Sequence, residues 1–323
     1  MDTVMDRTVI AGFSNVGYRL RSRGWKASDL APMDGQVVLV TGANSGLGFA
    51  AAEGFARLGA TVWLAVRNSE RGEDARARIE ESTGRGSVHV GICDLSRLES
   101  VREFAERFSA EAGRLDVLVN NAGVLTEQRE VSADGIEMTL ATNVVGPFLL
   151  TGLLAPLLEA SAPSRVINVS SGGMYTEKLA ADDLQFERGT FDGTTAYART
   201  KRAQVVLTEL WAQRLQQAGV VVHCMHPGWA DTPGLRVSLP RFYRATQFLL
   251  RTPDEGADTI VWLGAAPEPA QRSGGFWHDR RERSTHMVPR TTESAADRDE
   301  LWQQCMWLSG LDLGLVSPAN SAS

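Results

Sequence analysis

Short valine-rich runs alternate with longer amphipathic stretches from Gly35 onward, and this alternation constrains the fold more than any other feature of the chain. Runs that are apolar along their whole length are typical of parallel strands buried on both faces, and the stretches between them have helical periodicity. The predicted strands are Gln36–Val40, Thr61–Val66, Ser87–Ile92, Val117–Val119, Arg165–Val169, Val220–Met225 and Gly275–Trp277. We therefore predict an α/β fold, a doubly wound, Rossmann-type parallel sheet of about seven strands with helices on both faces.

Two extensions flank the predicted domain, which covers residues 35–283 without an internal repeat or a clean linker. The N-terminal extension, residues 1–34, has apolar residues near helical spacing, followed by a basic cluster. The apolar residues are Val9, Ile10, Phe13, Val16 and Leu20, and the basic residues are Arg19, Arg21, Arg23 and Lys26. We expect this extension to dock on the domain, and peripheral contact of residues 1–30 with a membrane surface is the alternative.

The C-terminal extension, residues 284–323, is charged and polar but contains one apolar cluster. This cluster predicts a packing helix and comprises Leu301, Trp302, Met306, Trp307 and Leu308. Residues 317–323 are small and polar and are expected to fray.

The overall composition is that of a globular protein, with 43% hydrophobic and 22% charged residues. The 33 basic and 39 acidic residues give a formal charge of -6 without a block of like charges, so no nucleic-acid partner is expected. Cys93, Cys224 and Cys305 form no CxxC pair, which favours a reducing compartment and a cytoplasmic location.

One uncharged stretch, Met138–Leu158, is long enough to span a bilayer. It contains Asn143, Gly146 and Pro147, and an unpaired amide in hydrocarbon costs several kcal/mol. We therefore predict a buried helix here and no transmembrane segment.

A glycine-rich turn follows the first predicted strand and leads into a helix-like run, Phe49–Leu58. Glycines at such a turn let the backbone approach a pyrophosphate, whose charge the N-terminus of the helix meets. The candidate cofactor-binding residues of the turn are Gly42, Asn44, Ser45, Gly46, Leu47 and Gly48. A purely structural turn is the alternative, and the position between strand and helix favours dinucleotide binding.

Arg67 stands where the second predicted strand ends. An acidic residue at this place would hydrogen-bond the ribose 2′-hydroxyl of NAD, whereas an arginine accommodates the 2′-phosphate of NADP. The expected cofactor is therefore NADP(H), with NAD(H) as the alternative.

Tyr197 and Lys201 are four positions apart on a predicted helix and so share a face. A free phenol titrates near 10, too high for easy proton transfer at neutral pH. A neighbouring ammonium favours the phenolate and lowers the tyrosine pKa. The pair is thus a candidate proton shuttle.

With these features the chain resembles the short-chain dehydrogenase/reductase family. The glycine turn has that family's TGxxxGxG spacing, Asn120 to Gly123 resemble its NNAG motif, and Ser171 falls in its catalytic-serine segment. The resemblance implies that Asp94 and Leu95 contact the adenine. It also implies that the backbone of Asn121, Ala122 and Gly123 lines the cofactor side of the sheet.

The resemblance also implies a catalytic set of Asn143, Ser171, Tyr197 and Lys201. Ser171 would hold the substrate oxygen, with Ser170 as its structural neighbour. Lys201 would also bind the nicotinamide ribose, and Asn143 would anchor a water in the proton relay. The loop that contains Pro227, Gly228 and Thr232 would cover the nicotinamide.

Ser171 and Tyr197 stand 26 positions apart, about twice the gap usual in the family. The extra segment, Met174–Thr195, resembles that of the retinol-dehydrogenase-like branch and is expected to lie over the active site.

His223, Cys224 and His226 are clustered in the way of metal ligands, but the first two would point to opposite faces of a strand. We predict no metal site.

The resulting hypothesis is a carbonyl reductase or alcohol dehydrogenase that transfers a hydride between NADP(H) and an apolar small molecule. A catalytically silent dinucleotide-binding regulatory protein is the alternative, because fold alone does not establish activity. The sequence leaves a homo-oligomer open.

Overall fold

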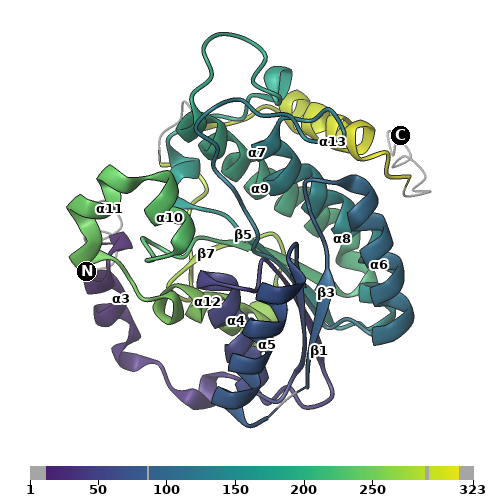
Figure 1. Ribbon diagram of the computed structural model, residues 1–323, viewed down its shortest axis with the longest axis vertical. Helices are drawn as coiled ribbons and strands as arrows, with labels where there is room; N and C mark the ends of the chain where they lie inside the picture. The colour runs from purple at the N-terminus through teal and green to yellow at the C-terminus, as the bar shows by residue number, and fades with distance from the viewer. Residues whose placement is uncertain (1–11, 86, 288–290, 313–323) are drawn as a thin grey trace, which may run out of the picture.

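The computed structural model describes residues 12–85, 87–287 and 291–312, and its centre is one eight-stranded sheet (Figure 1). The strand order is β3-β2-β1-β4-β5-β6-β7-β8. The strands are β1 (Val37–Thr41), β2 (Thr61–Val66), β3 (Ser87–Ile92), β4 (Val117–Asn120), β5 (Ser164–Val169), β6 (Val220–Met225), β7 (Phe276–His278) and β8 (Arg281–Glu282). All neighbours pair in parallel except β7 and β8. The predicted doubly wound α/β fold is confirmed.

The eighth strand was not predicted. β8 has two residues, both exposed, and carries no apolar signal. It pairs with β7 through a turn in which Asp279 and Arg280 adopt the left-handed conformation, with φ of 51° and 54°. Such a turn depends on tertiary contacts rather than on glycine, so local sequence does not mark it.

Helices cover both faces of the sheet (Figure 1). One core cluster packs α4 (Gly46–Arg57), α5 (Ser69–Thr83) and α12 (Pro253–Ala265) on one face. The other packs α6 (Leu98–Ala112), α8 (Gly146–Ala160) and α9 (Gly193–Leu215) on the opposite face. Alternation along β1 sends Leu39 into one core and its neighbours Val38 and Val40 into the other.

The uncharged stretch forms α7 (Met138–Leu140), a π-helical turn (Ala141–Val145) and α8. Within the described residues, Met138–Ala160 is the single helical stretch long and apolar enough to cross a membrane. Of its most apolar window, 78% is buried inside the protein, which is the environment of a core helix.

The N-terminal segment forms α3 (Asn15–Arg21) and two short 3-10 turns, Ser22–Gly24 and Ala27–Asp29. Of the apolar residues expected to form one docking stripe, Phe13 is buried, whereas Val16 and Leu20 are exposed. Val9 and Ile10 lie outside the described residues. The segment therefore contacts the domain through Phe13, whereas Val16 and Leu20 face solvent.

A buried ion network joins this segment to the domain. The Arg251 guanidinium donates to both carboxylate oxygens of Asp279, at 2.5 and 2.9 Å, and Arg21 donates to the same carboxylate at 2.7 Å. Arg251 also donates to the carbonyls of Gly12 and Ser14, at 3.1 and 3.2 Å. One side chain thereby ties the start of the described chain to the end of β7.

The C-terminal helix α13 (Ala295–Ser309) begins with a capping box between Ser294 and Asp297. Trp302 is buried edge-on against Trp211 and Phe148. Trp307, expected to pack with it, is 77% exposed, because it points away from the face on which Leu301 and Trp302 lie. Residues 317–323, expected to fray, lie outside the described residues.

We predict that Asp279→Asn lowers the free energy of unfolding by about 3–5 kcal/mol, because it leaves two arginines without their carboxylate. Burial alone would raise the pKa of Asp279, but His278 and Arg251 together with hydrogen bonds from Arg251 and Arg21 lower it to about 2. Since an unfolded aspartate titrates near 3.9, this stabilisation is complete above that pH and is lost as the pH falls toward 2.

Thermal and urea unfolding between pH 2 and 7 measures this effect. In the variant, the free energy of unfolding should also fall less steeply as the pH is lowered. Asp182→Asn, which breaks an exposed ion pair with Arg188, is the control and should leave the melting temperature unchanged. An Asp279→Asn protein as stable as the wild type at pH 7 would contradict the role of the network.

Candidate active site

The four candidate catalytic residues come from three elements that meet beyond the carboxyl ends of the central strands. Asn143 lies in the π-helical turn before α8, Ser171 follows β5, and Tyr197 and Lys201 lie on α9. The carboxyl ends of parallel strands are where α/β folds bind ligands. The structure brings all four residues to this one edge of the sheet.

The two serines after β5 have different surroundings. Ser170 is buried, and its hydroxyl donates to the carbonyl of Lys201 at 2.9 Å, which ties the strand end to α9. Ser171 is partly exposed, accepts a hydrogen bond from the amide of Gly173 at 3.2 Å, and lies close enough to Tyr197 to lower the tyrosine pKa. Ser171 is thus the serine that reaches the tyrosine hydroxyl.

The pKa of Tyr197 differs from the sequence-based expectation. Burial raises this pKa, and the hydrogen bond with Ser171 works in the opposite direction. The Lys201 ammonium lies 5.4 Å from the centre of the tyrosine ring. Lys201 is not among the causes of this shift, and its ammonium donates to neutral acceptors instead.

Lys201 is 3% exposed, so its ammonium group depends on hydrogen-bond acceptors inside the protein. It donates to the carbonyl of Val169 at 2.9 Å and to Oε1 of Gln204 at 3.1 Å. Burial lowers the pKa of Lys201 to about 8, and the neighbouring Cys224 acts against that shift.

Asn143 is fully buried, and its side chain ties the loop after β4 to α9. Its Oδ1 accepts from the amide of Val124 at 2.8 Å, and its Nδ2 donates to Val124 O and to Thr200 Oγ1, each at 3.0 Å. Its carbonyl accepts from Nε2 of Gln204 at 2.7 Å. The sequence analysis missed Thr200 and Gln204, although Gln204 stands one helical turn after Lys201.

The glycine turn has the geometry that a bound dinucleotide requires. Gly42 and Gly46 have φ of 64° and 55°, in the region that favours glycine. A Cβ on Gly48 would lie 2.4 Å from the Gly42 carbonyl oxygen, so a side chain there would displace the turn. The Ser45 side chain does not cap α4, which leaves the amides of its first turn for an anion.

The loop after β4 lies against this turn and against the catalytic helix. The Asn121 side chain donates to the Thr41 carbonyl at 2.8 Å, and the Ala122 amide donates to Thr41 Oγ1 at 3.1 Å. A Cβ on Gly123 would lie 3.4 Å from Lys201 Nζ. The predicted motif residues thus stand between the glycine turn and Lys201.

Three other candidate cofactor residues stand at the ends of β2 and β3. Arg67 is exposed directly after β2, and no hydrogen bond or ion pair within the described chain holds its guanidinium. Asp94 is partly buried after β3 and accepts from the amide and hydroxyl of Ser96, at 3.0 and 2.7 Å. Leu95 is buried beside Gly146.

The loop with Pro227, Gly228 and Thr232 reaches the glycine turn, and the N-terminal segment packs behind it. A Cβ on Gly46 would lie 3.3 Å from Thr232 Cγ2, and one on Gly256 would lie 3.5 Å from Pro227 Cβ. Gly228 has φ of 75° and leaves no room for a side chain beside Phe13 O. Phe13 is thus part of the site's support.

The extra segment after Ser171 contains two 3-10 turns, Gly172–Tyr175 and Ala181–Asp183. Its Gln185 accepts from the amide of Glu137 at 3.2 Å, and Gln304 of α13 donates to the carbonyl of Ala181 at 2.9 Å. It is therefore held between the loop before α7 and the C-terminal helix.

His223 is a core residue whose ring nitrogens are both occupied. Nδ1 accepts from Trp277 at 3.0 Å, and Nε2 lies 2.9 Å from the Pro269 carbonyl. Across the residues that the structure describes, no three His, Cys, Asp or Glu side chains are grouped to hold a metal.

Comparison with known proteins identifies the family of this chain. The pattern of the short chain dehydrogenase family matches residues 36–240. Dehydrogenase/reductase SDR family member 12 of Bos taurus is 45% identical over 294 residues, covering 90% of this chain and 91% of the relative. Retinol dehydrogenase 14 of Homo sapiens is 35% identical over 312 residues, covering 91% of this chain and 90% of the relative.

A crystal structure shows the same architecture. An uncharacterised protein from Mycobacterium paratuberculosis superposes with a TM-score of 0.73 at 28% identity, covering 90% of this chain and 100% of that chain. Sequence pattern, full-length relatives and fold therefore agree. The chain belongs to the short-chain dehydrogenase/reductase family and is an NAD(P)-dependent oxidoreductase.

Proposed function

We propose that this enzyme interconverts a carbonyl and an alcohol on an apolar small molecule with NADP(H), acting as a carbonyl reductase when NADPH is bound. One observation carries the proposal: Ser171, beside Tyr197, stands with Lys201 and Asn143 at the edge of the sheet where the glycine turn lies. Proton donor, oxygen-binding hydroxyl and dinucleotide-binding turn thus share one edge.

A bound nicotinamide dinucleotide supplies the hydride in reduction and accepts it in oxidation. In the reductive direction Tyr197 gives its hydroxyl proton to the substrate oxygen, and the reverse transfer completes alcohol oxidation. Ser171 donates a hydrogen bond to the same oxygen and stabilises the charge that develops on it. Lys201 offers a donor to the nicotinamide ribose, and Asn143 braces α9 through Thr200.

The other candidate cofactor-binding residues can be assigned to parts of the dinucleotide from their positions at this edge of the sheet. The first turn of α4, with Gly42, Asn44, Ser45, Gly46, Leu47 and Gly48, would hold the pyrophosphate. Asp94 and Leu95 would contact the adenine, the backbone of residues 121–123 would line the sheet side, and Pro227, Gly228 and Thr232 would cover the nicotinamide. Arg67 is exposed and has a free guanidinium among the described residues, which favours the 2′-phosphate of NADP over NAD.

Two observations support an apolar substrate. One relative is named retinol dehydrogenase 14, and retinol is an apolar alcohol. The extra segment before α9 contributes partly exposed apolar side chains, among them Leu184 and Phe191. We propose that this segment shapes an apolar substrate site.

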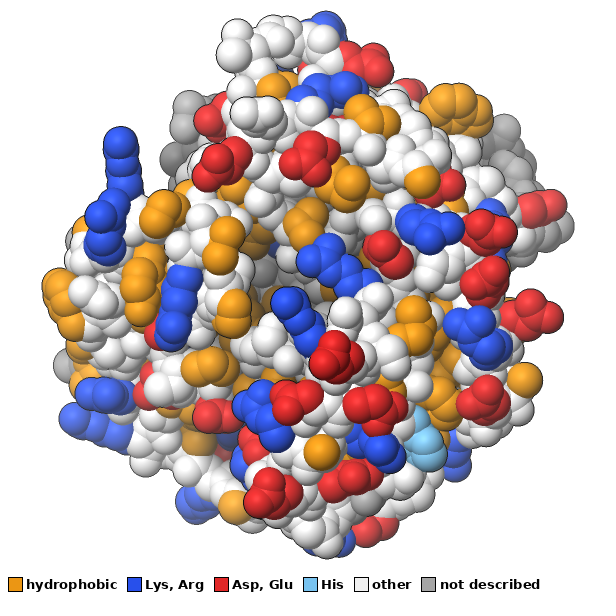
Figure 2. All heavy atoms as spheres, viewed as in Figure 1, with side chains coloured by type: hydrophobic (Ala, Val, Ile, Leu, Met, Phe, Trp, Pro, Cys, Tyr) orange, Lys and Arg blue, Asp and Glu red, His pale blue; other side chains and the backbone are white. Residues whose placement is uncertain are grey.

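We further propose a cytoplasmic enzyme that contacts anionic membrane surfaces peripherally. Val16 and Leu20 of α3 are exposed, and Val237 and Phe248 are 76% and 71% exposed near α10 (Pro233–Ser238) and α11 (Pro240–Thr246). Asn15 donates to the carbonyl of Phe248 at 3.1 Å, so the two regions adjoin. Residues 233–249 contain three arginines and no acidic residue, and Figure 2 shows hydrophobic and basic side chains interleaved at the left of the view.

We predict that Tyr197→Phe lowers kcat for carbonyl reduction by roughly 10²- to 10⁴-fold, because the phenylalanine carries no proton. NADPH binding, measured by fluorescence titration, should change little. A panel of apolar aldehydes and ketones provides the assay, and Tyr243→Phe on α11 is the matched control. Equal turnover by Tyr197→Phe would refute the proton carrier, and a wild type that binds NADPH without any turnover would favour the silent dinucleotide-binding protein.

We predict that Arg67→Ala raises the Kd for NADPH by roughly 10- to 100-fold and leaves the Kd for NADH almost unchanged, since only NADPH has the 2′-phosphate. The control is Arg76→Ala on α5, an exposed arginine paired with Glu73. Tighter binding of NADH than of NADPH by the wild type would overturn the assignment of Arg67.

We predict that the full chain floats with vesicles containing phosphatidylserine and less with phosphatidylcholine vesicles. The double variant Val237→Asp with Phe248→Asp should remain in the soluble fraction. Val131→Asp, a change at another exposed apolar residue, should float like the wild type. Equal flotation of both variants would contradict the proposed surface.

A further inference from the structure

The carbonyl of Asn143 is a buried acceptor that its own helix does not satisfy in the usual way. In an α-helix this carbonyl would accept from the amide four residues later, but that residue is Pro147, which has no N–H. The chain forms a π-helical turn at this point, Ala141–Val145. The donor four residues later is therefore missing, which leaves this buried carbonyl open to a donor from another element.

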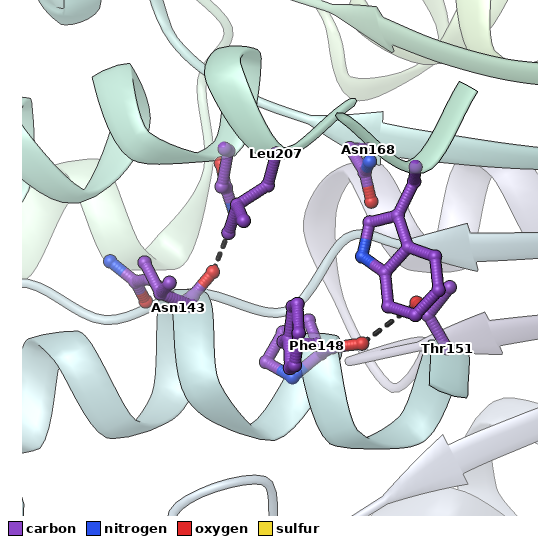
Figure 3. A pocket seen from close by; sticks show the side chains of 9 residues that line it. Asn143, Phe148, Thr151, Asn168 and Leu207 are labelled. Atoms are coloured by element: carbon purple, nitrogen blue, oxygen red, sulfur yellow. Dashed lines mark hydrogen bonds between the residues drawn. The ribbon is translucent and has the colours of Figure 1, made fainter. Parts of the chain in front are cut away.

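The side chain of Gln204 is that donor. It is buried on α9, and its Nε2 donates to Asn143 O at 2.7 Å; Figure 3 shows this bond arriving at Asn143 from the helix that carries Leu207. Its Oε1 accepts from Lys201 Nζ at 3.1 Å. One amide group thus joins the backbone of one candidate catalytic residue to the ammonium of another.

The structure assigns Gln204 as a positioning residue that holds Lys201 and Asn143 in fixed relation, an inference that rests on the proposed function of these two residues. The sequence led us to expect that Asn143 anchors a water in the proton relay. Both side-chain polar atoms of Asn143 bond to Val124 or Thr200, and its carbonyl bonds to Gln204. The Gln204 amide thus bridges Asn143 and Lys201 directly.

Four groups, including the Gln204 side chain, surround the Lys201 ammonium. From its own helix Tyr197 presents its ring, from β5 Val169 presents a carbonyl, and from β6 Cys224 presents a thiol. Within the described chain no carboxylate pairs with Lys201, so Oε1 of Gln204 is one of two neutral acceptors for the charged form. Any change in the charge or polarity of residue 204 should therefore move the Lys201 titration.

A small cavity lies beside Gln204 and makes an alanine substitution unsuitable as a test. Its volume is about 20 Å³, and Asn143, Thr151, Asn168, Gln204 and Trp211 are among its lining residues. This is room for about one water. Shortening Gln204 to alanine would join its volume to this cavity and make room for water that replaces the amide, so variants of similar size to glutamine are needed.

Gln204→Glu and Gln204→Met give opposite expectations. In Gln204→Glu a carboxylate faces the ammonium and raises the Lys201 pKa, so the upper limb of the pH profile of kcat/KM should move up by about 1–3 units. In Gln204→Met the charged lysine loses an acceptor, so this limb should move down by about one unit. Both variants lack the donor to Asn143 and should lose roughly 10- to 100-fold in kcat.

The pH dependence of the NADPH Kd, followed by fluorescence, should show the same opposite shifts without turnover. Gln213→Met, an exposed change on α9, is the control and should keep the wild-type profile. Unshifted profiles in both variants, or shifts of the same sign, would overturn the role of Gln204. If Gln204→Met does not fold, the direction of the Gln204→Glu shift alone decides. A wild type without carbonyl turnover would instead refute the proposed function, and the binding profiles would still test the bridge.

Discussion

The ammonium group of Lys201 lies inside the protein, and the arrangement of the site follows from the need to keep that charge hydrogen-bonded. A buried cation without acceptors would lose its proton or destabilise the fold. The carbonyl at the end of β5 and the amide of Gln204 supply the acceptors. The bond to Val169 fixes the strand end and α9 relative to each other at the place where Ser171 lies beside Tyr197, whereas the bond to Gln204 lies within α9. The need of the buried Lys201 ammonium for hydrogen-bond acceptors thus determines how the candidate catalytic residues are arranged.

A second buried cation, Arg251, is satisfied in a different way. Its guanidinium has five donors, which reach the Asp279 carboxylate and the carbonyls of Gly12, Ser14 and Pro227. Since an arginine keeps its charge at any relevant pH, an ionised partner suits it and the network is structural. Lys201 has neutral partners and a pKa lowered to about 8, so it remains able to titrate. Arg251 therefore stabilises the structure, whereas Lys201 remains available for proton chemistry.

Most of the fold could be predicted from the sequence because the strands of a parallel sheet are buried on both faces. Their apolar runs are continuous, and the predicted bounds of β2, β3 and β6 match the observed ones. β8 escaped prediction because its arginine and glutamate are exposed and a tertiary turn sets its pairing. Trp307 was misplaced because helical spacing shows which residues share a face, whereas the face that meets the protein depends on the docking angle.

The candidate site was predictable where a motif is local and unpredictable where distant segments meet. Pro147 deprives Asn143 of a helical donor, and both residues are visible in the sequence. That Gln204 supplies the donor depends on how α9 packs against the π-helical turn, which no spacing reveals. The direction of the Tyr197 pKa shift was unpredictable for the same reason. Helical spacing correctly places a lysine nearby, but the sign of the shift depends on how deeply the tyrosine is buried. Neighbours along a helix can be predicted from periodicity, whereas the balance of desolvation and charge requires the packed structure.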